Sequence, residues 1–184
     1  MFPNIERKQI SMSNKRNKIR IAITGGHHTT ALALLPKLRK ELERRGFEPL
    51  FFWIGHRFSM QGDKNDSLEY LEVTALRIPF FELSAPKFYR NSLISVLFRL
   101  MLGVIRSLII MLKVRPNIVI SFGGYLAVPP VLAASILKIR SVTHEQTASA
   151  GFANRLISRF CEKVYISFAS SRRYFPKQKT ILTG

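Results

Sequence analysis

A chain of 184 residues is long enough to bury one α/β core but short for the two-domain architecture of many enzymes with large substrates, so one domain is expected. The 29 Lys and Arg against 11 Asp and Glu give a net charge of +18, which favours an anionic partner such as nucleic acid, a phosphate ester or an acidic membrane surface. The single cysteine, Cys161, excludes an internal disulfide, and no Cys/His spacing resembles a zinc site. We therefore expect a reducing, cytoplasmic setting and neither a metal nor another cofactor.

The N-terminal part predicts a basic arm followed by a βαβ unit. Residues 1–18 are polar and basic and lack the apolar stretch of a secretory signal, so a flexible arm is expected there. From Ile19, IRIAI predicts a strand, residues 31–45 followed by Gly46 predict a helix, and EPLFFWIG predicts a second strand.

The rest of the chain repeats this alternation. A polar loop is expected over HRFSMQGDKNDSLEY, followed by the apolar run ALRIPFFEL and a long apolar helix over residues 92–114. Later strands are predicted at NIVISF, RSVTHE, KVYISF and KTILTG, with helices over GGYLAVPPVLAASILK and residues 151–160. Strands separated by helices indicate a parallel sheet covered on both faces. Residues 19–184 are thus predicted to form an α/β, Rossmann-like doubly wound domain that binds ligands at the carboxyl ends of its strands.

The junction TGGH, which contains Thr24, Gly25, Gly26 and His27, follows the first strand and opens the first helix. Unpaired N–H groups and the helix dipole favour an anion there, and glycine lets the backbone approach a ligand closely. A tight turn without a ligand explains the two glycines equally well. Neither G-x-G-x-x-G nor the G-x-x-x-x-G-K-[ST] phosphate loop is present, which disfavours a dinucleotide or ATP.

His27 is a candidate general base, because an imidazole titrates near neutral pH and can take a proton from a substrate hydroxyl. A lone histidine is more often structural, but the position of His27 on a glycine turn at a strand end favours a function. His28 is expected only to start the helix.

Two further strand ends carry polar or glycine-rich segments. Gly123, Gly124 and Tyr125 follow NIVISF, so the Tyr125 hydroxyl either lies near a ligand or belongs to a ring packed over the sheet edge. The next strand ends in His144 and Glu145 and runs on into Gln146 and Thr147. Such side chains are costly to bury unpaired, so they either bind one another or face a ligand.

These motifs, in this order, resemble the MurG family of glycosyltransferases, which add N-acetylglucosamine to a lipid-linked muramyl-pentapeptide. The resemblance rests on TGGH, SFGGYLAVPP, HEQ, GFANRL and the final TG, and it extends over residues 19–184. It implies one half of a GT-B fold, the N-terminal acceptor-binding half, with the C-terminal half that supplies most of the UDP-sugar pocket lying outside this sequence. The chain alone is then expected to be inactive.

Carried onto this sequence, the resemblance implies that Thr24, Gly25 and Gly26 form a diphosphate-facing loop that also contributes to donor binding. It places His27, Tyr125, His144 and Glu145 on the acceptor side with Gly123 and Gly124, makes His27 the base and leaves Glu145 as the alternative. The chain departs from the family in two places. Ala22 and Ile23 stand where the family has an extra glycine pair, and Thr147 stands where it has the asparagine that contacts the donor sugar.

The apolar helix over residues 92–114 raises the question of a membrane. A helical wheel places Ser92, Ser95, Arg99, Gly103, Arg106 and Lys113 in one stripe, with apolar side chains over the rest. Two arginines inside a membrane span would each cost roughly 2.5–3.5 kcal/mol, which disfavours a transmembrane helix. The helix is either packed in the core or partly inserted beside anionic lipid, and the resemblance implies docking on the cytoplasmic face of the membrane.

Three functions remain open. The chain is the acceptor-binding half of a transferase that joins UDP-N-acetylglucosamine to a lipid-diphosphate-linked sugar, including the case of a membrane subunit whose donor-binding half is a separate chain. Alternatively, it is a lipid-diphosphate-binding module without catalysis. Charge alone also suggests a nucleic-acid binder, but no interleaving of aromatic and basic residues and no groove-reading helix supports specific nucleic-acid recognition.

Overall fold

The computed structural model describes residues 17–58, 65–83 and 93–183. Its centre is a seven-stranded parallel sheet with the order β3-β2-β1-β4-β5-β6-β7. The strands are β1 (Asn17–Thr24), β2 (Phe47–Gly55), β3 (Phe80–Glu82), β4 (Ile118–Ser121), β5 (Arg140–Glu145), β6 (Lys163–Ile166) and β7 (Thr180–Leu182). The buried strands read as apolar runs because helices cover both faces of the sheet.

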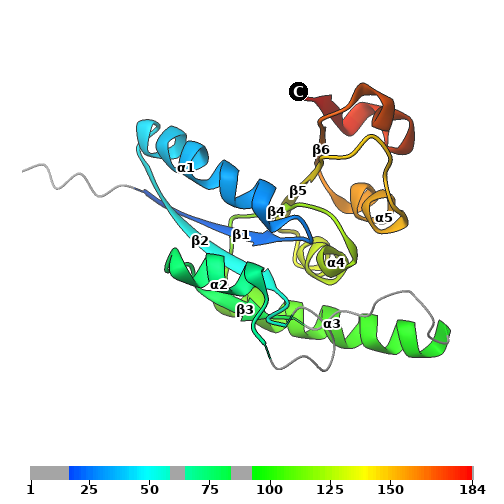
Figure 1. Ribbon diagram of the computed structural model, residues 1–184, viewed down its shortest axis with the longest axis horizontal. Helices are drawn as coiled ribbons and strands as arrows, with labels where there is room; N and C mark the ends of the chain where they lie inside the picture. The colour runs from blue at the N-terminus through cyan, green and yellow to red at the C-terminus, as the bar shows by residue number, and fades with distance from the viewer. Residues whose placement is uncertain (1–16, 59–64, 84–92, 184) are drawn as a thin grey trace, which may run out of the picture.

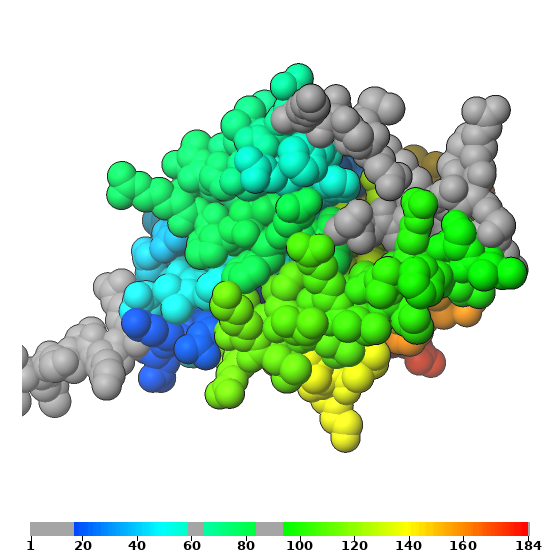
Figure 2. Space-filling model, turned by 90° about the horizontal axis from the view of Figure 1, so that it is seen from below, coloured from blue at the N-terminus to red at the C-terminus, as the bar shows by residue number. Residues whose placement is uncertain are grey.

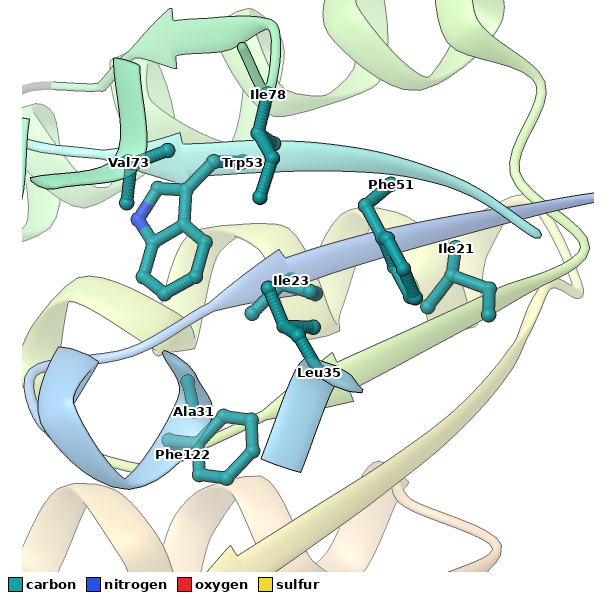
Figure 3. Close-up of a cluster of buried hydrophobic side chains, with 9 residues drawn as sticks. All are labelled: Ile21, Ile23, Ala31, Leu35, Phe51, Trp53, Val73, Ile78 and Phe122. Carbon is teal, nitrogen blue, oxygen red and sulfur yellow. The ribbon is translucent and has the colours of Figure 1, made fainter. Parts of the chain in front are cut away.

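The helices form two layers (Figure 1). One face of the sheet is covered by α1 (His28–Arg44) and α2 (Leu68–Ala75), which pack on the cluster drawn in Figure 3. The other face is covered by α3 (Leu93–Val114) and α4 (Val128–Ile136), and α5 (Phe152–Phe160) packs against α4. Short 3-10 turns complete the chain: η1 (Tyr125–Ala127), η2 (Ala169–Tyr174) and η3 (Lys177–Lys179). This arrangement confirms the predicted doubly wound α/β domain.

The strand order of the sheet reverses between β1 and β4, so successive strands are added first on one side of β1 and then on the other. The chain leaves β1 to build β2 and β3 on one side, then returns to place β4 directly beside β1 and continues outward to β7. Ligands of doubly wound sheets bind outside the carboxyl ends of the strands at such a switch point. The two glycine turns of the sequence follow these two strands, so the fold brings them together.

Two predicted boundaries are corrected by the structure. The expected polar loop over residues 56–70 contains the start of α2, which Ser67 caps by accepting a 3.2 Å hydrogen bond from the Tyr70 backbone N–H. β1 begins at Asn17, inside the predicted arm, because its first residues pair with β2 from Phe47 onward. Residues 1–16 of that arm lie outside the described residues.

α3 has one packed face and one exposed face. α3 packs on α4, and Gly103 of the expected polar stripe is buried, as is Ser107, which lies outside that stripe. Eight large apolar side chains are exposed: Ile94, Leu97, Phe98, Met101, Leu102, Ile105, Ile109 and Leu112. We call these eight residues the α3 apolar face; the helix lies across the view in Figure 2. Ile94–Val114 is also long and apolar enough to cross a membrane by length and composition.

Candidate functional site

The loops after β1 and β4 interlock at the switch point. Gly26 donates its backbone N–H to the Gly123 carbonyl oxygen at 2.9 Å, and Phe122 donates its own to the Thr24 carbonyl oxygen at 2.8 Å. Gly25 has φ +136°, and a Cβ at this position would lie 2.8 Å from backbone atoms of Phe122. Only glycine fits there, so the close approach of the two loops explains Gly25 of the TGGH sequence before any ligand is considered.

His27 is oriented by the second loop. Its Nδ1 lies 3.1 Å from the Phe122 carbonyl oxygen. A carbonyl oxygen can only accept, so Nδ1 carries the proton and the Nε2 lone pair is left as a base. The side chain is exposed to solvent, where a substrate can reach it. His28 starts α1 as expected and also has a partner, since its Nε2 lies 3.1 Å from Glu72 Oε2 on α2.

Glu145 is the centre of a buried hydrogen-bond network. Its side chain is 2% exposed, and Oε2 accepts a 2.5 Å hydrogen bond from Asn154 Nδ2. Oε1 accepts from the Thr147 backbone N–H at 3.0 Å and lies 2.6 Å from the Thr147 hydroxyl. The carboxylate therefore organises the end of β5, and both of its oxygens are buried and held by hydrogen bonds within the protein. This favours a positioning role over the reserve base that the sequence suggested.

Asn154 was not predicted as a site residue, although it lies in the GFANRL motif. Its Oδ1 accepts a 2.6 Å hydrogen bond from the Gly124 backbone N–H, while its Nδ2 holds Glu145. Gly123 has φ +71°, and a Cβ there would collide with the Asn154 amide. Asn154 thus connects the second glycine loop to Glu145 at the end of β5. Because Asn154 and Gly124 are 30 residues apart in the sequence, local spacing does not reveal this contact.

His144 is half-buried at the end of β5. Burial is the main cause that lowers its pKa, the nearby His27 lowers it further, and the charge of Glu145 opposes both. The ring therefore favours its neutral form. Its Nε2 lies 3.2 Å from the Ser167 hydroxyl, and its edge packs on Phe122 with ring centroids 6.0 Å apart. His144 accordingly lies beside the loop that holds His27.

Several buried polar atoms at this edge have no hydrogen-bond partner among the described residues. They are Thr24 Oγ1, His144 Nδ1 and both amide atoms of Gln146. An unmet buried polar group costs about 1–3 kcal/mol, and native proteins leave few of them. Their concentration at the ends of β1 and β5 makes this edge the candidate place for a polar ligand. Within the same described residues, no group of three His, Cys, Asp or Glu is arranged to hold a metal ion.

The remaining predicted residues lie at the borders of this edge. Thr147 points its hydroxyl at Glu145 and, at 2.7 Å, at the Ser149 carbonyl oxygen, so the hydroxyl is used within the loop. Tyr125 is half-buried on η1, and its pKa is raised first by burial and then by the charge of Glu69 on α2.

Comparison with known proteins agrees with this geometry. A relative from Borrelia hermsii, named UDP-N-acetylglucosamine--N-acetylmuramyl-(pentapeptide) pyrophosphoryl-undecaprenol N-acetylglucosamine transferase, is 35% identical over 88% of this chain and 42% of its own length. A relative of the same name from Clostridium perfringens is 36% identical over 91% of this chain and 45% of its own. The chain thus spans less than half the length of these relatives.

The solved structures lead to the same fold. Acinetobacter baumannii MurG superposes with a TM-score of 0.69 at 26% identity, over 90% of this chain and 45% of that one. A UDP-GlcNAc 2-epimerase from Methanocaldococcus jannaschii shares the fold at 13% identity, with a TM-score of 0.57 over 90% of this chain and 46% of its own. The model of the glycosyltransferase family 28 N-terminal domain matches residues 23–166. The switch-point loops, the MurG-type relatives and this match establish that the chain belongs to glycosyltransferase family 28.

Proposed function

We propose that this chain is the acceptor-binding half of a transferase that moves N-acetylglucosamine from UDP-N-acetylglucosamine to a lipid-diphosphate-linked muramyl-pentapeptide. The observation that carries the proposal is the pair of interlocked glycine loops at the switch point, bordered by unsatisfied buried polar atoms. The names of the relatives from Borrelia hermsii and Clostridium perfringens supply the donor and the acceptor.

The first glycine loop suits the diphosphate of the acceptor. α1 begins at His28, directly after the loop, so the positive end of a 17-residue helix faces this edge. Gly26 is exposed, and no atom lies within 4 Å of a Cβ built on it, so a ligand can approach the backbone there. Thr24 Oγ1, buried at the end of β1, offers a further hydrogen bond.

His27 is the proposed general base. Its Nε2 takes the proton from the acceptor hydroxyl as the hydroxyl oxygen bonds to the anomeric carbon of the donor sugar, and the bond from that carbon to the UDP diphosphate breaks. UDP leaves with the bonding electron pair. The Phe122 carbonyl oxygen, 3.1 Å from Nδ1, holds the ring in place and stabilises the imidazolium that forms.

A donor-binding half is expected to be necessary, because catalysis requires both substrates to be held together. We define the completed enzyme as this chain joined to the C-terminal half of the Clostridium perfringens relative. The chain alone is expected to transfer no measurable N-acetylglucosamine to the lipid acceptor, whereas the completed enzyme transfers it. Transfer of radiolabelled sugar into the lipid phase measures the activity of the chain alone and of the completed enzyme. Turnover by the chain alone would contradict the expectation that a donor-binding half is necessary.

We also propose that the chain docks on the cytoplasmic face of the membrane through the α3 apolar face. That face is exposed over the length of the helix, opposite the side that packs on α4. Arg99, Arg106 and Lys113 are exposed along one border of it, where they can meet anionic headgroups. This arrangement suits a helix that lies in the membrane–water interface, with its charged side chains at the level of the lipid headgroups.

Binding to vesicles that contain anionic lipid is expected to weaken with salt without vanishing. Salt screens the Lys and Arg attraction, whereas apolar insertion persists. Replacing Leu97, Met101 and Ile105 by serine is expected to lower the salt-resistant affinity by roughly tenfold or more. Vesicle co-sedimentation measures this, and Leu71→Ser, an exposed apolar residue of α2 on the other face of the sheet, is the matched control. Equal binding to neutral and anionic vesicles, or unchanged binding of the triple variant, contradicts the proposal.

A further inference from the structure

A second carboxyl group, separate from the Glu145 network, lies at the same edge of the sheet. Glu69, in the first turn of α2, accepts a 2.6 Å hydrogen bond at Oε1 from Trp53 Nε1. Trp53 is fully buried, and Figure 3 shows its nitrogen on the side of the ring nearest Val73 of α2. Gly55 makes room for the carboxyl group, because a Cβ on Gly55 would collide with Glu69 Oε1. Trp53 and Gly55 are thus both arranged around this acid.

Burial raises the pKa of Glu69 to about 7, and the hydrogen bond from Trp53 opposes that rise only in part. Within the described residues, no Lys, Arg or His forms an ion pair with it. The indole N–H can only donate, so Oε1 is an acceptor and the titrating proton belongs to Oε2. A glutamine would satisfy Trp53 without a desolvated acid, so the presence of a carboxyl group indicates a task beyond anchoring the indole.

The position of Glu69 connects it to both glycine loops. Thr24 pairs with Ile54 in the sheet, so Gly55 at the end of β2 lies next to the start of the TGGH loop. From the other loop, Tyr125 lies within electrostatic range of Glu69. One turn further along α2, Glu72 contacts His28, which brings this side of the helix against the start of α1.

We propose that Glu69 is a specificity-determining contact of the acceptor, with Oε2 hydrogen-bonded to an uncharged hydroxyl or amide group of the acceptor sugar and Tyr125 bordering the same group. This inference rests on the proposed function. A neutral acid suits this place, because an ionised carboxylate beside the acceptor diphosphate would repel it. The protonated Oε2 donates, and it accepts once the proton is lost, so hydroxyl and amide groups of N-acetylated sugars are suitable partners.

The test is steady-state transfer by the completed enzyme carrying Glu69→Ala or Glu69→Gln, with Glu43→Gln on the outer side of α1 as the matched control. Loss of one neutral hydrogen bond corresponds to about a three- to tenfold change in affinity. We expect Glu69→Ala to raise the acceptor KM by that factor, with kcat and the KM for UDP-N-acetylglucosamine within twofold of the unmutated values. Glu69→Gln keeps an acceptor for Trp53 and a polar group at the second position, so a smaller rise is expected.

Thermal unfolding of the same variants and of Trp53→Phe distinguishes a Glu69 that contacts the acceptor from a Glu69 that only stabilises the fold. A merely structural Glu69 predicts that Glu69→Ala and Trp53→Phe lower the Tm alike and leave the acceptor KM unchanged, and that result overturns the inference. A parallel rise in both KM values also overturns it. If the unmutated completed enzyme transfers no sugar, the proposed function itself fails and this inference falls with it, which is a distinct outcome.

Discussion

Replacing His27 by alanine is expected to lower kcat of the completed enzyme by about 10²–10⁴-fold, the usual contribution of a positioned general base. The reason is geometric: the Nδ1 proton is directed to the Phe122 carbonyl oxygen at 3.1 Å, which leaves Nε2 as the proton acceptor on an exposed side chain. The acceptor KM is expected to change little, because our proposal assigns binding of the diphosphate to the glycine loop and not to the imidazole. Transfer rates at saturating acceptor and donor measure the effect.

His28→Ala is the matched control for this experiment. It removes a neighbouring imidazole whose Nε2 contacts Glu72 at 3.1 Å and which has no place in the proposed chemistry, so turnover within a few-fold of the unmutated enzyme is expected. Retention of more than a third of kcat by His27→Ala contradicts the assignment. In that case Glu145 is a poor substitute as base, because both of its oxygens already accept hydrogen bonds.

Gly25→Val is expected to destabilise the fold by roughly 3–5 kcal/mol, since it adds a strained φ and an overpacked contact. At φ +136° a side chain is disfavoured, and its Cβ would lie 2.8 Å from the backbone of Phe122. For a domain of this size that corresponds to a fall in Tm of roughly 10 °C. Acceptor binding is expected to be lost as well, because the two loops can no longer pack together.

Gly26→Ala is the matched control, because it replaces a glycine of the same loop at a position where a side chain has room. No atom lies within 4 Å of a Cβ built on Gly26, and its backbone N–H still reaches the Gly123 carbonyl oxygen. Its stability is expected to stay within about 0.5 kcal/mol of the unmutated chain. Thermal melts followed by circular dichroism measure both variants, and a Gly25→Val variant that melts within 2 °C of the unmutated chain would refute the steric argument.

Local patterns were sufficient to predict most of the sheet and the edge at which the candidate site residues meet. Two segments show the alternation of buried and less buried residues that is typical of strands: Arg140–Glu145 and the apolar run that contains Ile118–Ser121. The glycine pairs mark the βα turns. Because parallel strands end at one edge, the pattern alone brings TGGH, SFGGY and HEQ together. By contrast, α2 begins inside the predicted polar loop, where the Ser67 cap marks its start.

Contacts between distant residues could not be predicted from the sequence. Gly25 looks like a ligand-facing glycine, yet the structure shows that Phe122 of the other loop already excludes a side chain there. Glu145 looks like a free acid until Asn154 and Thr147 are seen to occupy its oxygens. Gly55 leaves space for the Glu69 carboxyl group, and this role likewise depends on a helix that the sequence pattern did not predict.

The mass of the lipid product tests the central claim most directly. The completed enzyme is incubated with UDP-N-acetylglucosamine and N-acetylmuramyl-(pentapeptide) pyrophosphoryl-undecaprenol, the compounds in the names of the relatives. If this chain binds the acceptor at its switch-point loops, the lipid gains the mass of one N-acetylhexosamine, and His27→Ala slows that gain. An acceptor lipid of unchanged mass, from a completed enzyme that is folded and binds UDP-N-acetylglucosamine, contradicts the claim.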